Sequence, residues 1–361
     1  MKKMKMFALL FIFIFLGSIY ICGCGGSETT TPAPATNGDT ETPAPSVQPV
    51  EINFATWHHP TYPLNTEVWE PFIQDIEEKT EGRVKIYFHP GGVLVKGDET
   101  YDAIVTGTID MGFSLQSYTT GRFPLSSILE FPFMFTSSKQ ACLTAAELLK
   151  TNTAFQEEYG DVIPIWVGTT DASAMFATHR VNTIEDFKGL RIRTPGIIQN
   201  GVCEALGIVP TSMPYAEVYD AIQRGVVEGA FGPQCSILEH NFHEVAHELL
   251  QFELYATPLY TAMNKNTWNK ISPEDQEIIL ELMDELPAKI GEQYDTRLEA
   301  DKLIWEENKL YMYSLPDEEM QKIYNLIEPL EESWLSDMEA KGIAGREVYA
   351  EMKRLAEKYK Q

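Results

Sequence analysis

The sequence predicts an α/β fold built as two lobes, and three observations lead to this prediction. Strand-like segments alternate with amphipathic helical segments along most of the chain, as in layered α/β proteins. The alternation starts again near residue 187, which indicates a second α/β unit. About 310 residues remain after the N-terminal region, enough for two domains with separate hydrophobic cores.

The expected elements follow the chain in order. In the first unit, strands are expected at residues 52–56, 84–88, 111–114 and 162–168, and helices at 66–80, 100–106 and 139–150. In the second unit, a strand ends at Arg193, followed by a helix at 218–222, an apolar stretch at 226–232 and a helix at 237–249. A strand at 259–264 returns to the first unit, and helices are expected at 273–287, 288–308, 317–337 and 345–360. The predicted lobes are therefore 51–170 with about 258–297, and 171–257 with about 298–361.

The N-terminus is typical of a lipoprotein. Three lysines precede an apolar run from Met6 to Ile21, and Cys24 follows a small residue, which is the order of a secretory signal peptide. We expect residues 1–23 to be removed and Cys24 to be lipidated. Residues 24–50 contain almost nothing apolar, so they are expected to form a disordered tether. The alternative is an uncleaved membrane anchor, for which the apolar run is short. In both cases the folded part is expected outside the cytoplasm.

Composition argues against some partners. The formal charge is −25 at pH 7, so attraction to nucleic acid or to anionic lipid is not expected. Three cysteines remain in the mature chain, namely Cys142, Cys203 and Cys235. Their spacing matches no metal motif, and both one disulfide bridge and buried free thiols are compatible with it. No cofactor or metal is expected.

The segment around Arg193 carries the main functional signal. Arg193 ends a short alternating strand just before a Pro-Gly turn, where a guanidinium can hold a carboxylate with two parallel hydrogen bonds. A ligand cleft forms naturally at the carboxyl ends of such strands. The alternative is a structural ion pair with one of the many acids of the chain.

Residues 189–193 and 213–229 resemble the signature of the solute-binding proteins of TRAP (tripartite ATP-independent periplasmic) transporters, the DctP-type family. The first segment is Gly-Leu-Arg-Ile-Arg, and the second contains Met-Pro-Tyr-x-Glu-Val-Tyr and Gln-x-Gly-Val-Val-Glu-Gly. Weaker similarity runs from Ile52 to about Gln276. The resemblance implies a class II periplasmic-binding-protein-like fold, with crossing segments and a long helix that braces both lobes. It also implies a receptor, not an enzyme, that delivers a small organic anion to membrane permease subunits.

The resemblance also assigns site residues. It implies that Arg193 pairs with the ligand carboxylate and that Tyr215 packs against the bound ligand. Four side chains that follow the first and third strands are expected where the cleft opens: Trp57, His58, Gln116 and Tyr118. The alternative role of these four is packing alone, because loop aromatics often serve only that purpose.

Two departures from the family pattern bear on the ligand. Many members have Gln-Glu-Asn-Pro where this chain has Ala-Phe-Gly-Pro at 230–233, and many have a second Arg where this chain has Thr-Thr-Asp at 169–171. One cation instead of two points to a single carboxylate. Phe231, and the room left at Gly232, point to a bulkier or more apolar body, with Gln234 replacing the lost amide. We therefore expect an aromatic or oxo monocarboxylate and not a C4-dicarboxylate or sialic acid.

Two other classes of function compete with this one. Residues 243–247 satisfy His-Glu-x-x-His, which on a helix places two imidazoles on one face to hold zinc, with Glu244 as general base. The metalloprotease alternative is weakened because no recognisable third zinc ligand follows. The third class is a lipid-anchored sensor or adhesin with a vestigial pocket.

Overall fold

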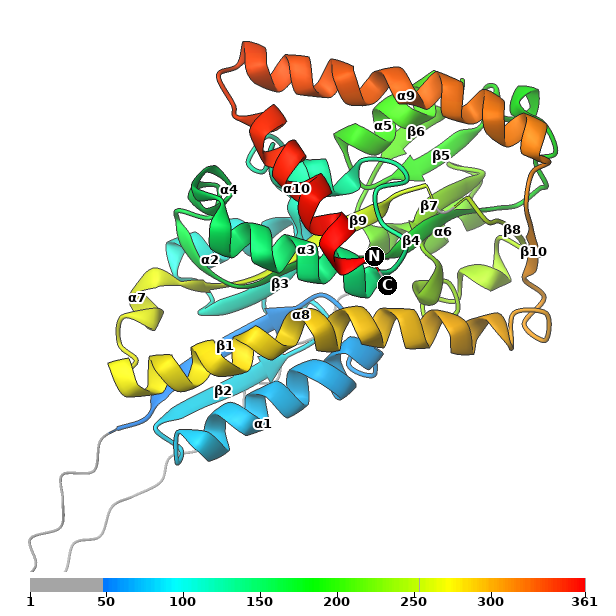
Figure 1. Ribbon diagram of the computed structural model, residues 1–361. Helices are drawn as coiled ribbons and strands as arrows, with labels where there is room; N and C mark the ends of the chain where they lie inside the picture. Colours follow the sequence, from blue (N-terminus) through cyan, green and yellow to red (C-terminus); the bar gives the residue numbers. More distant parts are fainter. Residues whose placement is uncertain (1–47, 253, 361) are drawn as a thin grey trace, which may run out of the picture. The chain divides into compact units, whose positions relative to one another are not determined.

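The computed structural model describes residues 48–252 and 254–360. The predicted signal peptide, Cys24 and nearly all of the predicted tether lie outside the described residues. The chain from Val47 onward forms one unit around a ten-stranded sheet covered by helices (Figure 1). None of the described helices is long and apolar enough to cross a membrane.

The strands are β1 (Val50–Thr56), β2 (Val84–His89), β3 (Met111–Leu115), β4 (Val162–Ala177), β5 (Arg191–Thr194), β6 (Val209–Ser212), β7 (Gly229–Pro233), β8 (Glu248–Leu250), β9 (Ala256–Asn264) and β10 (Tyr311–Tyr313). The helices are α1 (Glu70–Lys79), α2 (Thr100–Thr106), α3 (Ser138–Thr151), α4 (Thr153–Glu157), α5 (Ile197–Ala205), α6 (Val218–Gln223), α7 (Lys265–Trp268), α8 (Pro273–Lys302), α9 (Asp317–Ala340) and α10 (Gly345–Tyr359). Short turns of helix used below are η1 (Leu64–Trp69, a π-helix that leads into α1), η3 (Gln116–Tyr118), η4 (Ser126–Glu130), η6 (Tyr215–Glu217), η7 (Gln234–Ser236) and η8 (Phe242–Glu244).

Two long strands connect the lobes. The sheet order is β2-β1-β3-β9-β4-β7-β5-β6, and off this path β8 pairs with β4, and β10 pairs with β8. The first part of β4 pairs antiparallel with β9, and from Ser173 onward β4 pairs with β7. The parallel strands β1, β2 and β3 therefore belong to lobe I, and β5, β6 and β7 belong to lobe II. The predicted two-lobed α/β fold with crossing segments is confirmed.

The C-terminal helices hold both lobes. The sequence predicted a break at Pro287, but α8 continues through it, because Leu286 and Ile290 on either side are fully packed into the core of lobe I. Further along α8, Leu298 packs against the core of lobe II, so this helix spans both lobes (Figure 1).

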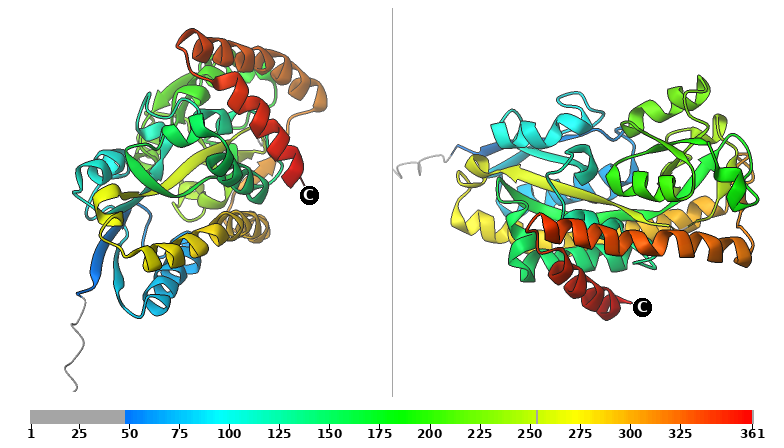
Figure 2. Two further views of the ribbon diagram at one scale, coloured as in Figure 1. Left: turned by 60° about the vertical axis from the view of Figure 1, so that its left-hand side comes forward. Right: turned by 90° about the horizontal axis from the view of Figure 1, so that it is seen from above.

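The two last helices return the chain to lobe I. Helix α9 packs against both lobes. Ile323, near its start, lies in a core of lobe II, and Leu335, near its end, lies in a core of lobe I. Helix α10 turns back from the end of α9 (Figure 2) and packs against α3 of lobe I, with Met352 fully buried. The sequence analysis had assigned α10 to the second lobe.

The prediction of a helix at residues 237–249 is wrong. Asn241 adopts a left-handed backbone conformation, with φ at 57°, which interrupts the helical path. The segment contains the short turn η8 instead, and Glu248–Leu250 joins the sheet as β8, paired with β4 and β10. Strand pairing and burial of Leu249 and Leu250 thus outweigh the helical pattern of the sequence.

One buried carboxyl group sits where the lobes meet. Glu130 of lobe I is 3% exposed and accepts a hydrogen bond from Nε2 of Gln199 of lobe II at 2.5 Å. Burial raises the pKa of Glu130 to about 8, although the hydrogen bond from Gln199 favours the ionised form. The Oε1 atom of Gln199 has no partner, so it can accept a hydrogen bond from a neutral group at position 130.

We expect Glu130→Gln to stabilise the protein increasingly as the pH rises from about 4.5 to about 8. In this window the wild-type carboxyl is protonated when folded and ionised when unfolded, so wild-type stability falls with pH, by up to about 1.4 kcal/mol per pH unit. A glutamine at position 130 is neutral over the whole window, so the variant does not lose this stability as the pH rises. Urea unfolding of both proteins at pH 5, 6, 7 and 8 measures the gap, and a gap independent of pH would contradict the assignment.

Candidate functional site

A small cavity lies between the lobes at the carboxyl ends of strands from both. It encloses about 30 Å³, which is room for only one or two water molecules. The lining residues come from the loop after β1, the ends of β3, β5 and β7, the turns η6 and η7 with the loop after η7, the crossing strands and α8: Trp57, His58, Tyr62, Leu115, Thr170, Arg193, Pro195, Tyr215, Pro233, Ser236, His240, Thr257, Leu259 and Tyr294. The lobes are closed on this space, so a ligand enters when they move apart.

Arg193 is the single Lys, Arg, Asp or Glu side chain in this lining. Its side chain is buried, and its Nε donates to the carbonyl of Met213 at 2.9 Å and its Nη1 to the carbonyl of Phe231 at 3.4 Å. Its Nη2 has no hydrogen-bond partner. No ion pair between described residues involves Arg193, so the alternative of a structural ion pair is not what the structure shows. A buried guanidinium with a free N–H and no counter-charge is suited to receive an anion.

Aromatic rings surround this guanidinium. Tyr215 of η6 lies under Arg193, with 5.0 Å from the guanidinium carbon to the ring centre, and its hydroxyl is 2.6 Å from that of Ser236. The ring of Trp57 lies 6.4 Å from that of Tyr215. The backbone N–H of Tyr215 donates to the hydroxyl of Tyr118 at 2.8 Å, which joins lobe II to lobe I. Tyr118 therefore stands beside the cavity, outside its lining, as a link between the closed lobes.

Two neutral imidazoles complete the wall. His58 is stacked on Tyr62 at 3.9 Å between ring centres, and burial, with a smaller effect of His240, holds the pKa of His58 well below its usual value. Burial, together with His59 and Arg193, lowers the pKa of His240 to about 4. Both rings are therefore uncharged at neutral pH, and Arg193 supplies the net charge of the cavity.

Two predicted site residues face other parts of the molecule. Gln116 is buried, and its Nε2 donates to the hydroxyl of Tyr159 and to the carbonyl of Leu259, both at 3.0 Å. Phe231 packs its ring among those of Phe252 and Tyr255 in a core of lobe II. Its backbone carbonyl still serves the site, because it accepts a hydrogen bond from Arg193.

The room expected at Gly232 is not there. A Cβ atom at this position would lie 2.7 Å from the hydroxyl oxygen of Tyr215 and 2.9 Å from its ring. Tyr215 therefore fills the space beside Gly232, and in this arrangement the glycine leaves no added room for a ligand. Gln234 does not line the cavity either, since its Nε2 donates to the carbonyl of Ala172 on the other side of the crossing strands.

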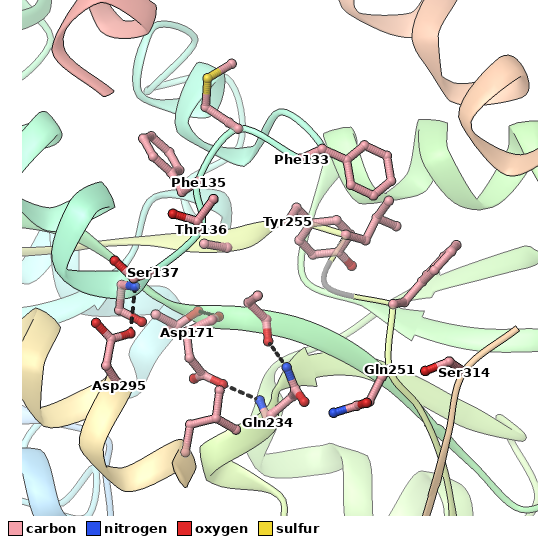
Figure 3. A pocket seen from close by; sticks show the side chains of 18 of the residues that line it. Phe133, Phe135, Thr136, Ser137, Asp171, Gln234, Gln251, Tyr255, Asp295 and Ser314 are labelled. Atoms are coloured by element: carbon pink, nitrogen blue, oxygen red, sulfur yellow. Dashed lines mark hydrogen bonds between the residues drawn. The ribbon is translucent and has the colours of Figure 1, made fainter. Parts of the chain in front are cut away.

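Behind the crossing strands lies a much larger cavity, of about 760 Å³ (Figure 3). Gln234, Tyr255 and Asp171 line it, and its rim carries the exposed ring of Phe133. Thr170 of β4 lines both this cavity and the small one, so one layer of crossing strands separates them.

The zinc alternative is not supported. The backbone from His243 to His247 is not a continuous helix, since η8 ends at Glu244 and the chain enters β8 at Glu248. The two imidazoles do not share a helical face, and Glu244 accepts a hydrogen bond from the Tyr219 hydroxyl at 2.8 Å. Within the described residues, no group of three or more His, Cys, Asp and Glu side chains is placed to hold a metal ion. The three described cysteines are free and buried.

Several lining residues were missed by the sequence analysis, above all Tyr62, His240 and Tyr294. Tyr62 and His240 lie in loops that follow β1 and η7, and Tyr294 comes from the long helix α8. Position after a strand end could have pointed to Tyr62 and His240, as it did for Trp57 and His58. Nothing local marks Tyr294, because it reaches the cavity only through the packing of α8 on lobe I.

Comparisons with known proteins agree on the family. Residues 54–337 match the model of the family described as bacterial extracellular solute-binding protein, family 7 (DctP). A 2,3-diketo-L-gulonate-binding periplasmic protein of Escherichia coli (strain K12) is 28% identical over 211 residues, which are 57% of this chain and 63% of that protein. A monocarboxylate 2-oxoacid-binding periplasmic protein of Nostoc sp. (strain PCC 7120) is 29% identical over 240 residues, 63% of each chain.

A solved structure shows the same fold. The TRAP solute-binding protein of Rhodoferax ferrireducens T118, crystallised with copurified benzoate, superposes with a TM-score of 0.80 at 23% identity, over 86% of this chain and 98% of that one. The resemblance inferred from the Arg193 segment is thus confirmed. The chain belongs to the bacterial extracellular solute-binding proteins of family 7, the non-enzymatic receptors of TRAP transporters.

Proposed function

We propose that this receptor captures an organic monocarboxylate with an aromatic or oxo-substituted body and delivers it to a TRAP permease. The observation that carries the proposal is Arg193, a buried guanidinium with an unused N–H and no acidic partner, on the wall of the cavity between the lobes. When the lobes open and close again around a ligand, a carboxylate at Arg193 forms a charge-assisted pair that is shielded from water, where such a pair is strong.

The charge of the cavity favours one carboxylate over two. Arg193 supplies one positive charge, and the imidazoles of His58 and His240 are neutral. A second carboxylate would be buried without a counter-charge, which is costly. The rings of Trp57 and Tyr294 favour an apolar or aromatic body.

Two relatives support this ligand class. The similar protein of Nostoc sp. is named for monocarboxylate 2-oxoacids, and the similar structure from Rhodoferax ferrireducens holds benzoate. The lipid anchor at Cys24 stays a prediction from the sequence, because that residue lies outside the described part of the chain.

Calorimetric titration with a panel of acids tests the proposal. We expect benzoate, phenylacetate or a 2-oxo monocarboxylate to bind more tightly than succinate, fumarate and sialic acid. A dicarboxylate as the tightest ligand would overturn the monocarboxylate assignment, and absence of binding by every organic acid would overturn the proposed function itself.

A further inference from the structure

Four polar atoms in the lining of the small cavity have no hydrogen-bond partner. They are Nη2 of Arg193, Nε1 of Trp57, Nδ1 of His58 and Nε2 of His240. All four atoms are shielded from solvent in the closed arrangement. Buried polar atoms in native proteins almost always have a partner, so four together in one cavity indicate that something else supplies the partners.

The carboxylate assigned to Arg193 accounts for only part of this set. The His240 ring and the Arg193 guanidinium both lie 5.0 Å from the Tyr215 ring centre, the guanidinium over the face of the ring and the imidazole nearly perpendicular to it. Trp57 stacks on His240 at 6.3 Å and contacts His58 at 4.1 Å between ring centres. The rings of Trp57, His58 and His240 therefore form one cluster, and Tyr215 contacts both this cluster and Arg193.

The chemistry of this cluster selects a neutral polar group. The indole N–H of Trp57 can only donate, whereas a neutral imidazole donates at one nitrogen and accepts at the other. With no formal charge, the cluster has little to offer a second carboxylate or an ammonium group. A hydroxyl group can donate to an imidazole and accept from the indole, and a carbonyl oxygen can accept from both kinds of ring.

We infer that the ligand carries a hydroxyl or carbonyl group in addition to its carboxylate, and that His240, with Trp57 and His58, binds that group and sets the specificity of the receptor. The inference rests on the proposed function, because it takes the Arg193–carboxylate pair as the other anchor. The ligand class is thereby narrowed to hydroxy- or oxo-substituted monocarboxylates. A purely hydrocarbon acid such as benzoate leaves the three ring nitrogens without partners, and such loss of a matched hydrogen bond is a strong basis for discrimination.

The test compares ligands that differ by one oxygen function. Dissociation constants are measured for benzoate against 3-hydroxybenzoate and 4-hydroxybenzoate, and for phenylacetate against mandelate and phenylglyoxylate, with the full-length mature protein. We expect the substituted acid to bind at least about tenfold more tightly in one or more of these pairs. In His240→Phe, which keeps an aromatic ring beside Phe242 and Trp57, that ratio should fall to within about twofold of unity, whatever happens to the affinity for the parent acid.

Control variants separate the possible outcomes. His179→Phe makes the same substitution on the exposed surface and should keep the wild-type ratio. Trp57→Phe removes the indole N–H and should reduce the ratio independently of His240→Phe. A wild-type ratio near unity for every pair would overturn the inference while leaving the Arg193–carboxylate pair in place. A ratio retained in His240→Phe and in Trp57→Phe would overturn the assignment of these residues. Failure of every acid to bind is the separate result that overturns the proposed function.

Discussion

Replacing Arg193 by methionine is expected to weaken the binding of any carboxylate ligand by roughly 30-fold to several thousand-fold, or about 2–5 kcal/mol. Methionine keeps the apolar stem of the side chain but leaves a ligand carboxylate buried without a positive partner. Much of the loss is the cost of that unpaired charge, so it should appear mainly as faster dissociation. Titration calorimetry measures the affinity, and stopped-flow tryptophan fluorescence measures the dissociation rate.

The matched control lies two residues earlier on the same strand. Arg191→Met removes the same charge, but Arg191 points to the surface, where its guanidinium pairs with Glu228 at 3.4 Å. Its effect on affinity should remain within about twofold, because exposed charges act weakly at a distance through water and salt. Equal losses in both variants would mean that Arg193 acts only through the overall field, and an unchanged affinity in Arg193→Met would remove it from the site.

Gly291→Ala is expected to destabilise the folded protein by about 1–3 kcal/mol or more, with a fall of several degrees in Tm. Gly291 lies where α8 crosses the start of α3, and a Cβ atom there would stand 2.4 Å from Cα and 2.8 Å from N of Lys139. These are backbone atoms and cannot swing aside. Asp295 of α8 also accepts hydrogen bonds from the N–H groups of Ser138 and Lys139, at 2.8 and 3.1 Å, so the two helices cannot separate without losing this cap.

Gly201→Ala is the control for this substitution. Gly201 also lies inside a helix, α5, but the nearest atom to its added Cβ would be Nε1 of Trp334 at 3.9 Å, an ordinary contact. Alanine is about 0.5–1 kcal/mol more favourable than glycine within a helix, so this variant should be unchanged or slightly more stable. Thermal and urea unfolding of both variants measure the change in stability. An equal change in Gly291→Ala and Gly201→Ala would show that α8 can shift away from α3.

The order of strands and helices was largely accessible from the sequence, because local periodicity reflects which face each segment buries. Most predicted segments of the first unit lie within one or two residues of their observed bounds. The exception is β4, which was predicted to end at Gly168 but continues to Ala177. That extension carries the strand from one lobe to the other. Its partners, β9 and β7, come from distant parts of the chain, and no local pattern predicts them.

The site was accessible only in part, for a related reason. Arg193 and Tyr215 stood in a recognisable segment, and Trp57 and His58 stood after a strand end. Gln234, however, is one residue beyond Pro233, and this single step takes it to the other side of the crossing layer. Which side a residue faces depends on how the strands cross, which the sequence around β7 does not reveal.

The four unpartnered atoms of the small cavity also affect how often the receptor closes without a ligand. Each shielded polar atom without a partner makes closure around an empty cavity less favourable, by about 1–3 kcal/mol. We therefore expect ligand-free receptor in solution to favour the open form over the closed one, because water can then supply the missing hydrogen bonds. Only a ligand that replaces the hydrogen bonds of that water makes the closed form the more stable one. A permease that recognises the shut form would then meet loaded receptors far more often than empty ones, without any proofreading step of its own.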